Sequence, residues 1–142
     1  MKKILGKISL RKFEPKTSKT KKDVARKIEL RNKIRGSRSN LPQIRKDCEG
    51  KKISLRIKFR LSKQQEENVS KYRKDLDNML KIVLDVFPEY MDNNKTNKGL
   101  GLIDNDESVY EIKAEKIFVD TDVEQGIDIE ISRVVIRKNR TR

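Results

Sequence analysis

The sequence contains no histidine, no tryptophan and a single cysteine, and these absences exclude several kinds of site. Because Cys48 has no partner within the chain, an internal disulfide cannot form. Without histidine, a zinc site of the mixed Cys/His type cannot be built either. Any metal that the protein binds must therefore be held by oxygen ligands.

Long apolar runs are also missing. No stretch reaches the roughly 18 consecutive apolar residues of a membrane-spanning helix, and the basic N-terminus is not followed by a signal-type hydrophobic segment. Hydrophobic residues make up 34% of the 142 residues, against 41% charged. We expect a soluble, cytoplasmic, nucleoid-associated protein with one domain over residues 1–136 and a modest core. The basic residues 137–142 are expected to form a disordered tail.

Charge is distributed unevenly along the chain. Residues 1–60 hold 22 Lys/Arg against 5 Asp/Glu, a net charge of +17, whereas residues 61–142 hold 14 against 17, a net charge of −3. A polycation of this density is suited to a polyanionic partner, and nucleic acid is the commonest one inside cells. A solubilising charge excess is the simpler alternative. Only 5% of the residues are aromatic, so base stacking is not expected to dominate affinity.

The order of the predicted elements defines the fold class. Alternation of apolar and polar residues predicts strands at 4–11, 53–61, 109–119 and 127–136, and helical spacing predicts helices at 23–35 and 75–87. The sequence therefore predicts an α/β (α+β) domain with a small mixed sheet and two main helices, in the order strand, helix, strand, helix, strand, strand. Residues 36–52 are expected to be a long connection. The last two strands are expected to form a hairpin, and parallel pairing is expected early in the chain.

The stretch most suited to chemistry is Asp75-Leu76-Asp77-Asn78, with Lys81 one helical turn further on. Two residues separated by one other point in nearly opposite directions inside a regular helix, so these carboxylates converge only if the helix begins between them. In that case they lie beside exposed N–H groups, which favour anions. A third acid would complete an oxygen site for Mg²⁺, and the run Asp104-Asn105-Asp106-Glu107 is the candidate source.

Each acidic cluster also has a simpler interpretation. Aspartate at a helix start is most often a cap, and Asp77 followed by Lys81 is most often a weak surface ion pair. Acidic turns such as 104–107 are common. The coincidence of both clusters with a strongly basic half of the chain favours a metal-dependent site that acts on nucleic acid.

Two segments carry a resemblance to a known family. The stretches Lys74-Asp-Leu-Asp-Asn-Met-Leu-Lys81 and Leu102-Ile-Asp-Asn-Asp-Glu-Ser-Val109, with a later Lys116, resemble the RusA family of Holliday-junction resolvases. The predicted order of strands and helices is similar as well. The resemblance implies a RusA-like fold and a homodimer that nicks four-way DNA junctions with Mg²⁺, or Mn²⁺, as cofactor. By position, it implies that Asp75, Asp77 and Asp106 bind the metal and that Lys81 is catalytic.

Further cations are expected to contact backbone phosphates without recognising bases. Three of these cations occupy alternate positions of one predicted strand. Their like charges would repel one another in the absence of an anionic partner. The expected contacts are Arg56, Lys58, Arg60, Lys116, Lys16, Lys19, Lys21 and Lys22. Two other functions stay open: a Mg²⁺ nuclease that prefers flaps or forks, and a non-catalytic basic protein that binds nucleic acid.

Overall fold

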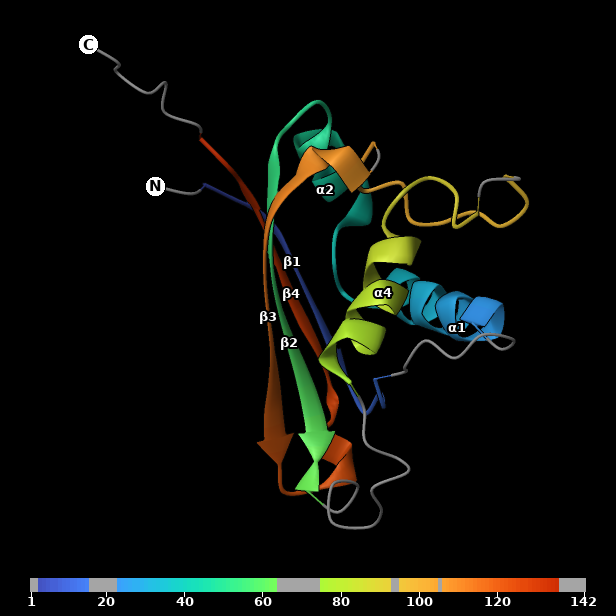
Figure 1. Ribbon diagram of the computed structural model, residues 1–142, viewed down its shortest axis with the longest axis vertical. Coiled ribbons are helices and arrows are strands. Elements are labelled where there is room, and N and C mark those ends of the chain that lie inside the picture. The colour runs from blue at the N-terminus through green and yellow to red at the C-terminus, as the bar shows by residue number, and fades with distance from the viewer. Residues whose placement is uncertain (1–2, 16–22, 64–74, 93–94, 105, 136–142) are drawn as a thin grey trace.

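The computed structural model describes residues 3–15, 23–63, 75–92, 95–104 and 106–135, with side chains for all of these except Asp23 and Asp106. The chain alternates strands and helices (Figure 1). In order, the elements are β1 (Lys3–Arg11), α1 (Asp23–Arg35), α2 (Leu41–Cys48), β2 (Ile53–Ser62), α4 (Leu76–Val86), the 3-10 helix η2 (Asp106–Ser108), β3 (Val109–Val119), the 3-10 helix η3 (Asp122–Glu124) and β4 (Gly126–Arg133).

The four strands form one mixed sheet in the order β1-β4-β2-β3. Strand β4 runs antiparallel to both β1 and β2, whereas β2 and β3 are parallel and joined by a crossover that contains α4. The predicted mixed sheet is therefore confirmed. The parallel neighbours are β2 and β3, and not the two earliest strands, because β4 inserts between β1 and β2.

The predicted hairpin of the last two strands is wrong, because β3 and β4 are separated by β2. Burial explains the choice of neighbours. Ile127, Ile129 and Ile131 of β4 are almost completely buried, as a central strand requires, whereas β3 is exposed along most of its length. Strand β4 also ends at Arg133, three residues before the predicted boundary.

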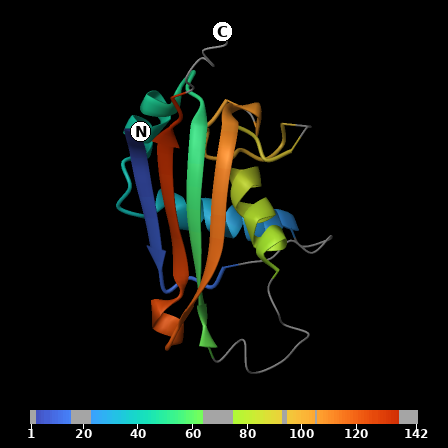
Figure 2. The same cartoon turned by 60° about the vertical axis from the view of Figure 1, so that its left-hand side comes forward.

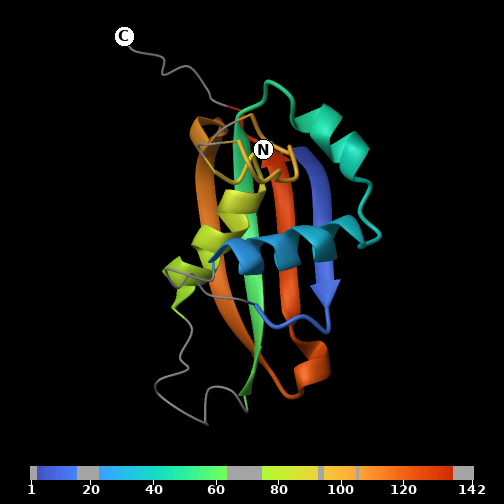
Figure 3. The same ribbon diagram turned by 90° about the vertical axis from the view of Figure 1, so that its right-hand side faces the viewer.

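Helices α1, α2 and α4 cover the same face of the sheet (Figures 1 and 3). In the described part of the chain no α-helix covers the other face, which we call the open face. Alternate residues of β2 from Ile53 to Leu61 are buried beneath the helices, which confirms the predicted alternation. Helix α4 contributes Met79, Ile82, Val83 and Val86 to the same core. The core is therefore a single layer between one sheet face and these helices.

Helix α2 corrects the predicted long connection over residues 36–52. Asn40 caps the helix, with its side-chain oxygen accepting a hydrogen bond from the Gln43 backbone N–H at 3.3 Å, and Pro42 occupies the first turn. Leu41, Ile44 and Cys48 are its buried residues. With eight residues, the helix is too short for apolar periodicity alone to reveal it.

None of the helices in the described part of the chain combines the length and apolar character needed to cross a membrane.

Candidate functional site

The amino-terminal end of α4 adopts the geometry that the acidic pair requires. Asp75 precedes the helix in an extended conformation, with φ −75° and ψ 135°, and Asp77 lies in the first helical turn. The Met79 N–H donates to the Asp75 carbonyl at 3.1 Å and so closes that turn. The helix thus begins between the two acids, which meets the condition for their carboxylates to converge.

The Asp75 side chain does not act as a helix cap. Its carboxylate accepts no hydrogen bond from the backbone N–H groups of α4. Its contact is a long one of 3.4 Å from the Asn78 side-chain amide. Asp75 and Asp77 are both exposed, so their oxygens are accessible to a cation. The capping interpretation of Asp75 is therefore wrong for its side chain, although the residue holds the capping position.

Lys81 follows Asp77 by one turn on the exposed side of α4. Among the described residues, no ion pair joins it to Asp77. Asp85, one turn further, instead pairs with Lys27 of α1 at 2.9 Å and ties the two helices together. The Lys81 ammonium is therefore available to a ligand that binds beside Asp77.

Lys116 lies on the same side of the sheet as α4. It pairs in register with Phe59 of β2, whose side chain is fully buried beneath the helices, and cross-strand partners share a face. Because β3 is an edge strand, Lys116 is nevertheless exposed. The structure therefore places this predicted phosphate contact on the face that carries the acidic pair.

Asp106 is not brought to the acidic pair within one chain. The segment before it is bonded to the carboxyl end of α4, where Leu100 N–H donates to the Val86 carbonyl at 2.7 Å and Leu102 N–H to the Phe87 carbonyl at 2.8 Å. Helix η2, which Asp106 opens, then leads into β3 at the opposite end of α4 from Asp75 (Figure 1). Over the described residues, no three acidic or Cys side chains gather as a metal-binding group.

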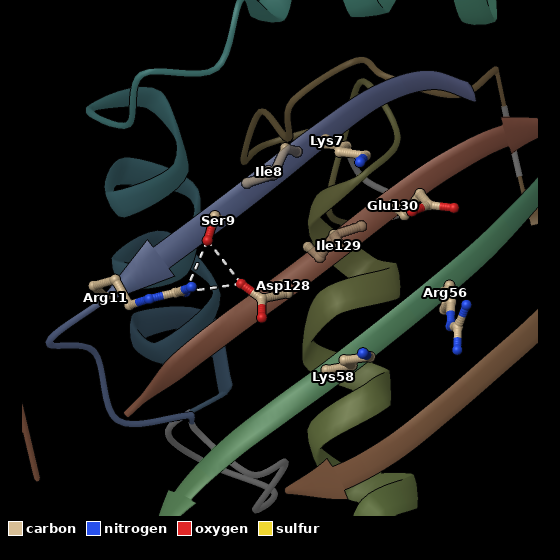
Figure 4. Close-up of a pocket in the computed structure, with 9 residues that line it drawn as sticks. All are labelled: Lys7, Ile8, Ser9, Arg11, Arg56, Lys58, Asp128, Ile129 and Glu130. Atoms are coloured by element: carbon tan, nitrogen blue, oxygen red, sulfur yellow. Dashed lines mark hydrogen bonds and ion pairs between the residues drawn. The ribbon is translucent and has the colours of Figure 1, made fainter. Parts of the chain in front are cut away.

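Two of the predicted cations of β2, Arg56 and Lys58, lie on the open face, away from α4 (Figure 4). Arg56 pairs in register with Glu130 of β4, and Lys58 pairs with Asp128. Together with side chains of β1 they line a shallow depression of about 300 Å³. The anionic partner that three alternating cations require is thus supplied, at least in part, by β4 of the same chain.

Asp128 is the centre of this face and was not singled out from the sequence. Its carboxylate accepts hydrogen bonds from the Ser9 hydroxyl at 2.7 Å and the Arg11 guanidinium at 2.8 Å, and it also pairs with Arg60. Burial raises the pKa of this carboxyl, but the three hydrogen bonds outweigh it and hold the pKa below its ordinary value. Alternation with Ile127 and Ile129 was the available signal, because it places Asp128 on the polar face.

A second cationic cluster fixes the loop after α4. Arg31 donates to the Lys98 carbonyl at 2.9 Å, Arg45 donates to the Leu100 carbonyl at 2.7 Å, and Arg35 donates to the Gly99 carbonyl at 3.3 Å. Burial, together with the nearby Arg31 and Arg45 charges, lowers the pKa of Arg35. These arginines hold the loop in place by donating hydrogen bonds to its backbone carbonyls. Their spacing in the sequence did not indicate this role.

Four predicted cations, Lys16, Lys19, Lys21 and Lys22, lie outside the described residues, as do Asn105 and the tail at 137–142. Comparison with known proteins adds no identification to this geometry. No family model matches the chain, and no curated protein matches it. The site must therefore be interpreted from its own residues: an exposed acidic pair at a helix start, with Lys81 and Lys116 on the same side of the sheet.

Proposed function

We propose that the protein is a Mg²⁺-dependent endonuclease that nicks branched DNA, with the four-way junction as its preferred substrate. The observation that supports this most directly is the start of α4, where the Asp75 carboxylate is free of capping bonds and Asp77 follows in the first turn. A pair of exposed carboxylates beside a helix N-terminus suits a divalent cation and a phosphate together.

The resemblance to the RusA family adds the reaction class and substrate to this geometry. The matching positions are Asp75, Asp77, Lys81 and Asp106, and the family acts as a homodimer on Holliday junctions. The order of elements is compatible with that resemblance. Four-way junctions have near two-fold symmetry, so a two-fold dimer would present one site to each of two opposed strands.

The donor set at the start of α4 fits Mg²⁺, which takes a few carboxylates and leaves its other positions to water and substrate oxygens. Asp75 and Asp77 would hold the ion there. When bound, Mg²⁺ supplies polarisation of the scissile phosphate and a water of lowered pKa. Asp106 remains a predicted third ligand. It lies at the opposite end of α4 from Asp75, so the conformation of the acidic pair in one chain does not depend on Asp106.

The lysines on this side of the sheet complete the proposed chemistry. Lys81 follows the acidic pair by one turn and would stabilise the charge that builds on the phosphoryl oxygens during in-line attack. Lys116 would hold a neighbouring backbone phosphate without recognising the base. Both are exposed, so both can meet DNA that approaches the helical side of the sheet.

A non-catalytic nucleic-acid-binding protein is the alternative that one observation favours. Within the described residues the acids do not gather into a trio, so a single chain presents two carboxylates and a surface rich in cations. A nuclease that prefers flaps or replication forks uses the same residues as the junction nuclease and differs in substrate only.

The deciding experiment is an incubation of the purified protein with a labelled four-way junction in Mg²⁺. We expect nicking that stops when the metal is chelated, and we expect Asp77→Asn to abolish it while junction binding persists. Fork, flap and linear duplex substrates in the same assay measure the substrate preference. Binding without cleavage by the wild-type protein would leave the non-catalytic alternative.

The matched control is Glu49→Gln, because Glu49 is an exposed acid at the end of α2, on another element. It should cleave at the wild-type rate. Lys81→Ala should lower the cleavage rate by about 100-fold or more with little loss of binding, as removal of a group that stabilises transition-state charge does. Normal turnover by Lys81→Ala would refute the role of this lysine.

A further inference from the structure

The outer edge of β3 is the longest unprotected strand edge in the described part of the molecule. The strand spans eleven residues, pairs with β2 on one side, and has no neighbouring strand among the described residues on the other (Figure 2). Tyr110, Ile112 and Phe118 are 52%, 42% and 37% exposed. An edge with exposed apolar side chains is a template for pairing with another strand.

Two-fold symmetry restricts how this edge could pair with its own copy. When two identical strands pair antiparallel about a two-fold axis, the axis is perpendicular to the sheet and one residue faces its own copy. Centring the axis on Lys113 or on Glu115 would place like charges directly opposite each other, which is unfavourable. Centring it on Ala114 places two small side chains at the axis instead.

The Ala114-centred register is complementary at the middle and at both ends of the strand. Lys113 of each copy faces Glu115 of the other, so two ion pairs form across the axis. Tyr110 faces Phe118, and Val109 faces Val119, so apolar residues also meet. Between these positions, Ile112 faces Lys116 and Glu111 faces Ile117, so the sequence VYEIKAEKIFV of β3 is palindromic in chemical character at its centre and ends. The aliphatic stems of Lys116 and Glu111 can pack against the isoleucines there.

The other edge of the sheet lacks this property. Strand β1 carries Lys3, Lys7 and Arg11 and no acid, so antiparallel pairing with its own copy cannot form an ion pair between the two strands in any register. Helix α2 also lies against β1, where a Cβ on Gly6 would approach the Ile44 side chain at 2.5 Å. Of the two sheet edges, β3 is therefore the one suited to a second copy.

We propose that two copies of this chain associate through antiparallel pairing of their β3 edges, with Ala114 at the two-fold axis. The two sheets then continue into one, with the helices of both copies on one side and both open faces on the other. The inference gives the homodimer of the proposed function its surface, but it rests on the edge of β3 alone. The competing explanation of these lysines is that Lys113 and Lys116 prevent association through the β3 edge, as lysines at sheet edges often do.

A charge swap separates these explanations. Wild-type protein, without DNA or metal, should show twice the chain mass in light scattering and sedimentation. Lys113→Glu places like charges opposite each other twice per dimer and should weaken association about tenfold or more, and Glu115→Lys should do the same. The double variant Lys113→Glu/Glu115→Lys restores both pairs and should dimerise again. Lys33→Glu, at an exposed site on α1, is the control and should remain dimeric.

Cysteine pairs test the register directly. Residues directly opposite each other in an antiparallel pair have Cα atoms about 4.5–5.5 Å apart, within disulfide range, whereas diagonal neighbours are about 7–8 Å apart. Under mild oxidation, Lys113→Cys/Glu115→Cys should therefore cross-link into covalent dimers, and Lys113→Cys alone should not. Thermal unfolding of each variant checks that it is folded.

A monomeric wild-type protein at all accessible concentrations would overturn the proposal, whatever its activity on DNA. A dimer that is indifferent to both single swaps, or that cross-links equally well through Lys113→Cys alone, would also overturn it. Loss of cleavage with an intact dimer would count against the nuclease proposal and leave the β3 interface standing.

Discussion

At the scale of single residues, Asp128 shows how the open face compensates its own charge. Its carboxylate is 23% exposed and pairs with Arg11 and Arg60 from the two flanking strands. Because hydrogen bonds hold its pKa below the ordinary value, the folded state favours the ionised form more than the unfolded chain does. The stabilisation is complete above the pKa of about 3.9 in the unfolded chain and is lost as the pH falls through the lower folded pKa.

We therefore expect Asp128→Asn to destabilise the protein by about 1–2 kcal/mol at neutral pH, the contribution of hydrogen bonds to a charged group that is partly exposed. The difference between wild type and variant should shrink below about pH 4, where the wild-type carboxyl becomes protonated. Urea unfolding at several pH values measures both effects.

Asp120→Asn is the matched comparison, because Asp120 also pairs with a cation, Lys63, at 3.1 Å, but is 79% exposed. Its stability should equal that of the wild type at every pH. A difference between wild type and Asp128→Asn that stays constant down to pH 3 would show that lost packing, and not ionisation, causes the destabilisation.

Local geometry at the acidic pair was predictable from the sequence, because helix start signals act within a few residues of Asp75 and Asp77. The position of Asp106 relative to them was not, since it depends on the direction of α4 across the sheet. The sequence also could not show that Arg56 and Lys58 face away from α4. Alternation separates the two faces of a strand, but it does not tell which face the helices will cover.

At the scale of elements, the number of hydrophobic repeats in each helix or strand determines whether it could be predicted from the sequence. Strands β1, β2 and β3 and helices α1 and α4 have enough residues for a repeat of two or 3.6 to be recognised. Helix α2 has three buried residues on a short stretch, so its capping residue and proline were the stronger signals. The neighbours of β4 could not be deduced from the sequence. Its position beside β2 follows from the burial of its side chains, and not from its proximity to β3 along the chain.

Contact between α2 and β1 provides a test at this scale. A Cβ on Gly6 would lie 2.5 Å from Cγ1 of Ile44, so Gly6→Val should force α2 off the strand. We expect a loss of about 1–3 kcal/mol, as for other overpacked sites. Urea unfolding measures it, and adding Ile44→Ala to Gly6→Val should recover part of the loss by making room.

Gly36→Ala is the control substitution, because a Cβ there would meet the Asn32 carbonyl oxygen at 3.5 Å, an ordinary contact. Its stability should remain close to that of the wild type. If Gly6→Val were equally harmless, the packing of α2 on β1 described above would be incorrect.

At the scale of the whole molecule, the sheet divides the basic surface into two sides. On the open side, Lys58 lies in register between Asp128 of β4 and Glu115 of β3, so an acid neighbours it on each adjacent strand. On the helical side, the strand neighbour of Lys116 on β2 is Phe59, which is not an acid. The proposed nuclease site lies on this second side.

DNA that reaches the acidic pair should therefore follow the helical side of the sheet, and salt dependence can show this. Each neutralised phosphate contributes about 0.9 to the slope of the logarithm of affinity against the logarithm of salt concentration. For an intact four-way junction in chelator, we expect Lys116→Gln to reduce the magnitude of that slope by about one and to weaken binding at low salt. We expect Lys58→Gln to leave both unchanged. Fluorescence anisotropy over a salt series gives the two slopes. The reverse result would place DNA on the open face and would leave Asp75 and Asp77 out of reach of the phosphate that they are proposed to cleave.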